Sequence, residues 1–81
     1  MNYKQIQYNM EEIVEEATNI LNGVKRGPGY TPDEYYQAMR HLIHHVNTAW
    51  NARDVSLDEA EAASPAQREA WGRFPTDIRL I

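Results

Sequence analysis

The sequence predicts an all-α fold, in which two long amphipathic helices pair as an antiparallel hairpin and two short helices follow. Three observations carry this prediction: two segments with apolar residues at helical spacing, a glycine- and proline-rich segment between them, and helix-start signals further along the chain. The 81 residues are too few for two separate cores, so residues 1–81 are expected to form a single helical domain.

The first helix is expected over residues 3–22. Its apolar residues recur at alternating spacings of three and four, which is typical of one helical face: Tyr3, Ile6, Met10, Ile13, Ala17, Ile20 and Val24. Gly23 tolerates the left-handed conformation in which many helices end, so we expect the helix to stop at Asn22. Residues 25–30, KRGPGY, then reverse the chain.

The second helix is expected over residues 32–51. Thr31 can cap it, Pro32 fits the first helical position, and Glu34 can complete a capping box. One wide face of this helix is apolar, with Tyr35, Tyr36, Met39, Leu42, Ile43, Val46, Ala49 and Trp50. Two helices of nearly equal length, joined by a reversing loop, favour antiparallel pairing.

Two short helices are expected near the C-terminus. Ser56 with Glu59 opens one over residues 57–62, and Ser64 with Gln67 opens another that ends at about Trp71. Isolated helices of this length are marginal in water, so both require packing against the hairpin.

Both long helices carry more apolar residues than one pairing seam can bury. Val14 and Leu21 lie beside the seam of the first helix, and Tyr36, Ile43 and Trp50 lie beside that of the second. The C-terminal helices can cover part of this surplus, and a second copy of the chain can cover the rest by completing a four-helix bundle. With no cysteine for a disulfide, a chain this short also needs such support. A homo-oligomer is therefore the expected state.

Composition narrows the function classes. The net charge of −4 provides no basic surface for phosphate backbones, so we expect no direct nucleic-acid binding. No apolar stretch is long enough to span a membrane or to act as a signal segment, and there is no cysteine, so we expect a cytoplasmic protein that does not enter a membrane. Neither a nucleophile with its base nor a cofactor fingerprint is present, so we expect no enzyme activity and no cofactor.

Four carboxylates on the first helix, Glu11, Glu12, Glu15 and Glu16, form like-charged pairs one turn apart. No lysine or arginine on the same helix is placed to offset them. They either form a solvated face or bind a partner protein with a basic surface.

Two further groups are candidates for binding. Trp71, Arg73 and Phe74 have the aromatic and arginine character of interface hot spots, although docking of Trp71 onto the hairpin explains that residue equally well. Lys25 and Arg26 precede a helix start and are a weak candidate for anion binding.

His41 and His45 lie one turn apart and could bind one metal ion from one face of the second helix. They make up half a site, because no glutamate lies between them as in zinc-protease motifs and no cysteine is available. The alternative is that they are ordinary surface and boundary histidines.

The leading hypothesis is a non-enzymatic module that binds or regulates another protein, such as a small inhibitor of the kind that phages or mobile elements encode. One alternative is a helical bundle that binds a small ligand or a metal ion. The other is a minor structural subunit of a larger assembly.

Overall fold

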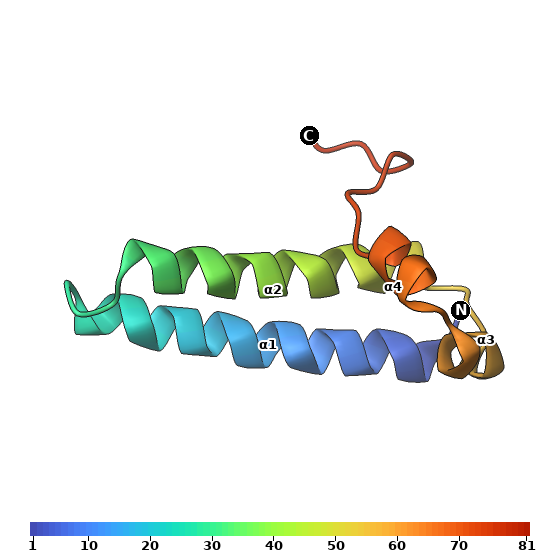
Figure 1. Cartoon of the computed structure of the whole chain (residues 1–81), viewed down its shortest axis with the longest axis horizontal. Helices are drawn as coiled ribbons and strands as arrows, with labels where there is room; N and C mark the ends of the chain where they lie inside the picture. The colour runs from blue at the N-terminus through green and yellow to red at the C-terminus, as the bar shows by residue number, and fades with distance from the viewer.

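The computed structural model describes residues 1–81 and contains four helices and no strand. α1 (Tyr3–Arg26) and α2 (Pro32–Asn51) run antiparallel along the long axis of the molecule, as Figure 1 shows. α3 (Leu57–Ala62) and α4 (Pro65–Trp71) lie at the end away from the hairpin loop, and the last residues extend away from α4. The predicted hairpin with two short C-terminal helices is confirmed. None of the four helices has the length and apolar character needed to cross a membrane.

Polar side chains cap the start of every helix. Asn2, Thr31, Ser56 and Ser64 each accept a hydrogen bond from the backbone N–H three residues further on. Ser64 forms the full capping box with Gln67, as predicted. Asn2 also donates its amide to a backbone carbonyl of the segment after α2, at 2.8 Å, which ties the start of α1 to the end of the hairpin.

α1 ends at Arg26, one turn beyond the predicted end at Asn22. Gly27 is the glycine with positive φ, at 82°, whereas Gly23 lies buried inside the helix. The ring of Tyr30 folds back onto Gly23, where a Cβ atom would lie 2.5 Å from Tyr30 Cε2. Gly23 therefore makes room for the loop instead of ending the helix.

The buried residues besides Gly23 are four polar residues and two alanines: Asn9, His45, Asn47, Thr48, Ala49 and Ala52. Most larger apolar side chains of the hairpin are half-buried or exposed. The single chain therefore has a very small apolar core, and hydrogen bonds between its helices carry much of their positioning.

The face of α1 that meets α2 differs from the predicted seam. Asn9 and Glu16 point at α2, where they contact His45 and His41. Of the predicted seam, Ile6, Ile13 and Ile20 are half-buried, whereas the other four members are exposed: Tyr3, Met10, Ala17 and Val24. The prediction placed the apolar stripe at the centre of the contact, but the polar contacts to the histidines take that place, so that one edge of the stripe is half-buried and the rest is exposed.

Side-chain amides hold α4 against α2. Asn47 donates to the Gly72 carbonyl at 2.9 Å. Asn51 donates to the carbonyls of Trp71 and Arg73, each at 2.7 Å. The ring of His44 occupies the space beside Gly72 that a side chain there would need. The contact lies on the histidine side of the hairpin. Of the surplus apolar residues that the C-terminal helices could have covered in part, Val14, Leu21 and Tyr36 remain exposed.

The extended tail is tied back to α2 at Trp50. The indole Nε1 donates to Asp77 at 2.9 Å, and this hydrogen bond lowers the pKa of the Asp77 carboxyl. The Arg53 guanidinium lies 3.8 Å from the centre of the Trp50 ring and 3.7 Å from Asp77. Trp50 is thus half-buried by polar and charged groups rather than by an apolar core.

Replacing Gly23 with alanine tests the packing of Tyr30. Alanine normally favours a helix interior, but here its Cβ would displace the ring, so we expect G23A to lower the free energy of unfolding by roughly 1 kcal/mol or more. Urea denaturation followed by circular dichroism measures the change. In a Tyr30→Ala background the same substitution should instead stabilise the protein.

Gly29→Ala is the matched control, because no atom lies within 4 Å of the added Cβ and its φ is not positive. A stabilised G23A variant with Tyr30 intact would show that the ring does not pack against Gly23.

Candidate functional site

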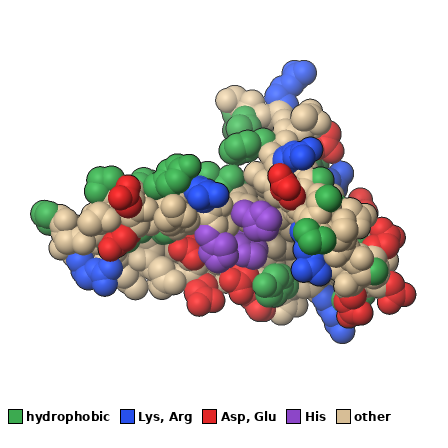
Figure 2. Space-filling view, viewed as in Figure 1, with side chains coloured by type: hydrophobic (Ala, Val, Ile, Leu, Met, Phe, Trp, Pro, Cys, Tyr) green, Lys and Arg blue, Asp and Glu red, His purple; other side chains and the backbone are tan.

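A polar cluster connects α1 and α2 near the middle of the hairpin. Asn9 and Glu16 contribute from α1, and His41 and His45 contribute from α2. Asn9 is 1% exposed and His45 is 8% exposed, so the inner part of the cluster is buried. Figure 2 shows the histidine side chains gathered on one face of the molecule, with acidic side chains beside them.

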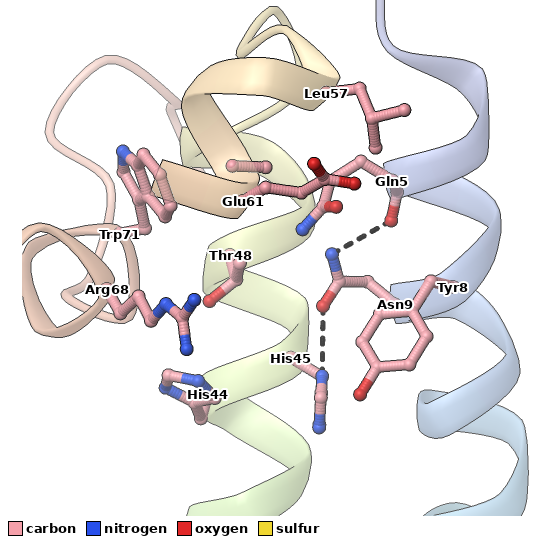
Figure 3. Close-up of a pocket in the computed structure, with 11 residues that line it drawn as sticks. Gln5, Tyr8, Asn9, His44, His45, Thr48, Leu57, Glu61, Arg68 and Trp71 are labelled. Carbon is pink, nitrogen blue, oxygen red and sulfur yellow. Dashed lines mark hydrogen bonds between the residues drawn. The ribbon is translucent and has the colours of Figure 1, made fainter. Parts of the chain in front are cut away.

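Asn9 sets the orientation and the tautomer of His45. The Asn9 amide donates to the Gln5 carbonyl at 3.0 Å, which leaves its Oδ1 to accept from His45 Nδ1 at 2.9 Å (Figure 3). The hydrogen of neutral His45 therefore sits on Nδ1, and Nε2 carries a lone pair. Burial, and then the nearby His41 and His44, lower the pKa of His45, so the neutral ring is favoured.

His41 is held in the same way by Glu16. Its Nδ1 lies 2.9 Å from a Glu16 carboxylate oxygen, which accepts a hydrogen bond, so Nδ1 donates. The Nε2 of His41 lies 3.1 Å from the Nε2 of His45. Two neutral rings in these tautomers point lone pairs at each other. The contact is favourable only when a proton or a metal ion lies between the two nitrogens.

Glu12 adds a third group to this pair. One ligand atom each from Glu12, His41 and His45 lie within 4.8 Å of one another, and Glu12 is half-buried. The sequence-based interpretation found half a site because it sought further ligands on the second helix, whereas the acid comes from α1. In an antiparallel hairpin, residues equally far from the loop lie level with each other. Glu12 lies 17 residues before Gly29 and His45 lies 16 residues after it, so the sequence contains the signal that pairs them.

The four glutamates of α1 divide into two pairs. Glu12 and Glu16 are half-buried beside the histidines, whereas Glu11 and Glu15 are exposed. Gln7 donates to Glu11 at 2.9 Å, so that carboxylate already has a neighbour on its own helix. A partner with a basic surface would meet Glu11 and Glu15 first.

A pocket of about 360 Å³ opens beside the polar cluster, where the four helices meet. Tyr8, Thr48, Glu61 and Arg68 line it, one from each helix, as Figure 3 shows. The Thr48 hydroxyl is buried there without a hydrogen-bond partner. His45 and Asn9 also line the pocket, so the cluster borders it directly.

The other two predicted binding groups lie at opposite ends of the molecule (Figure 1). Trp71 is half-buried and lines the pocket, whereas Arg73 and Phe74 are exposed beyond α4. Lys25 and Arg26 lie in the last turn of α1 rather than in a loop. Positive charge there complements the helix dipole, which accounts for both residues without a bound anion.

Exposed apolar residues line the side of the hairpin opposite α4 and the histidines. At about 100° per residue, they lie roughly a quarter-turn from the α1–α2 contact, on the same side of both helices. This apolar face comprises Tyr3, Met10, Val14, Leu21, Val24, Tyr35 and Val46. The antiparallel register, in which Asn9 meets His45 and Glu16 meets His41, places Met10 level with Val46 and Leu21 level with Tyr35. No charged residue of either helix interrupts the apolar face.

Comparisons of the chain with protein-family models, with curated proteins and with solved structures find no match. Function therefore has to be argued from the polar cluster, the pocket and the apolar face.

Asn9→Ala tests whether the polar cluster holds the two helices together. The substitution leaves the buried His45 Nδ1–H without its acceptor, so we expect the free energy of unfolding to fall by about 1–3 kcal/mol. Asn19→Ala is the control, because Asn19 is an exposed asparagine on the same helix. Thermal and urea unfolding measure both variants, and equal effects would mean that Asn9 contributes no more than a surface residue.

Proposed function

We propose that this chain is a non-enzymatic protein-binding module whose first partner is a second copy of itself. The apolar face supports this proposal, because it is uncharged, spans both long helices and lies on the side away from α4. A face of this kind on a small chain is typical of helices that complete a bundle.

The solvent-exposed area of the single chain is large enough to include a dimer interface. A folded monomer of 9.4 kDa exposes about 5,000 Å², whereas this chain exposes 6298 Å². The excess is on the order of 1,300 Å². A standard interface takes about 800 Å² from each partner, so a dimer contact of ordinary size fits within the excess.

A second copy fits the chemistry of the apolar face better than a charged partner does. Two-fold symmetry would bring the two apolar faces together without placing like charges opposite each other. The four long helices would then enclose one shared core, in the manner of a four-helix bundle. A basic partner would find no counter-charge on this face.

The dimer would leave other surfaces free for a regulatory target. Glu11 and Glu15 lie on α1 outside the apolar face, and Arg73 and Phe74 project beyond α4. Each dimer would present these groups twice, which strengthens binding to a partner with two matching sites. We expect regulation through such binding rather than through chemistry on a substrate.

Light scattering on the purified protein tests self-association. We expect a mass of twice 9.4 kDa at micromolar concentration. Met10→Lys and Leu21→Lys each place a charge on the apolar face and should raise the dissociation constant at least about tenfold. Asn19→Lys adds the same charge on the opposite side and should leave the dimer intact.

Circular dichroism of each variant, measured at matched concentrations, separates lost assembly from lost helix. A monomeric mass at every concentration up to the millimolar range would overturn the proposal. Equal dissociation constants for the three lysine variants would overturn the assignment of the interface to the apolar face.

A further inference from the structure

We propose that Glu12, His41 and His45 bind one zinc ion that clamps α1 to α2. The proposal goes beyond self-association and does not depend on it, because all three side chains belong to one chain. It stands on three features of the polar cluster: converging nitrogen atoms, a matching outer set of hydrogen bonds, and two carboxylates beside the site.

The spacing of the two ring nitrogens suits two ligands of one ion. His41 Nε2 and His45 Nε2 lie 3.1 Å apart. An ion at the usual zinc–nitrogen distance of about 2.05 Å from both would see them at an angle of about 100°, close to the tetrahedral value. The spacing of the two nitrogens therefore already suits a zinc ion.

Both histidines have the outer partners that metal-bound histidines typically have. A metal ligand of this type donates its second ring N–H to a carboxylate or carbonyl oxygen, which fixes the tautomer and directs the lone pair at the ion. His41 donates from Nδ1 to the Glu16 carboxylate, and His45 donates from Nδ1 to the Asn9 amide oxygen. The two Nε2 lone pairs are thus the ones left free.

Glu12 supplies the third ligand, and its charge matters as much as its position. One of its carboxylate oxygens lies within 4.8 Å of a ring nitrogen of each histidine, and rotation of its flexible side chain can bring it to the ion. Glu12 and Glu16 lie one turn apart and repel each other, so a divalent ion beside both relieves that repulsion. Two imidazoles and one carboxylate leave a fourth position for water or for a ligand.

The ligand set favours zinc and its neighbours over the abundant hard cations. Imidazole nitrogen suits zinc, cobalt, nickel and copper, whereas magnesium and calcium prefer sites built from oxygen ligands. The two helices each supply part of the site, so the ion can bind fully only when the hairpin is formed. Zinc binding should therefore stabilise the fold.

The experiment uses the full chain without a histidine tag, stripped of metal with a chelator. Isothermal titration with zinc chloride should give one ion per chain. At a hundredfold excess over the dissociation constant, the melting temperature should rise by at least about 10 °C. Cobalt chloride should give the visible absorption of a tetrahedral complex, while magnesium and calcium chloride should leave the melting temperature unchanged.

Matched variants assign the site to these residues. His41→Gln and Glu12→Gln each remove a ligand and should weaken zinc binding at least about tenfold, and Glu16→Gln should weaken it about 10–100-fold through the orientation of His41. Glu15→Gln removes a neighbouring glutamate that is not a ligand, and this variant should bind zinc as the unmodified chain does. His45 is left unchanged because its buried hydrogen bond to Asn9 also supports the fold.

The unliganded contact between the histidines would instead hold a proton. A zinc titration that gives neither heat nor a change in melting temperature would overturn the proposal, as would equal affinity of His41→Gln and the unmodified chain. Half an ion per chain would place the site between two copies and would also overturn it. The Met10→Lys variant weakens the proposed dimer without touching the zinc ligands. Its zinc affinity therefore tests the zinc site independently of self-association.

Discussion

The hydrogen bond between Asn9 and His45 is the contact on which the arrangement of the hairpin depends. It is buried between α1 and α2, and a side chain on either helix that lost its partner there would face a desolvation cost of about 1–3 kcal/mol. Because Asn9 must face α2, the neighbouring Glu12 and Glu16 also turn toward the histidines. Most of the apolar stripe of α1 then lies outside the contact with α2. One polar contact thus sets both the composition of the cluster and the exposure of the apolar face.

Local signals predicted the elements well, because helix starts depend on residues close together in sequence. Thr31, Ser56 and Ser64 cap the helices that their spacing predicted. The end of α1 was predicted wrongly because the role of Gly23 depends on Tyr30, a residue beyond the helix whose ring position no local pattern encodes. The rotation of α1 was missed for a related reason: apolar periodicity identifies an apolar side, but it does not say which partner that side meets.

In the candidate site too, residues on one helix could be predicted from the sequence, whereas the residue from the other helix could not. The spacing of His41 and His45 on one helix was visible in the sequence, and their convergence in the structure agrees with it. Glu12 was grouped with three other glutamates as a charged face, although pairing across the hairpin places it with the histidines. Its role follows only when the antiparallel register is combined with the rotation that Asn9 imposes.

The small apolar core has a consequence for the life of the protein in a cell. Within one chain, the buried apolar residues are only Ala49 and Ala52, so an isolated copy has little protection against opening and proteolysis. In the proposed dimer, each copy that finds a partner would shift the balance toward the folded form by mass action. Turnover of this chain should therefore fall as its abundance rises, so that newly made copies persist only after enough have accumulated.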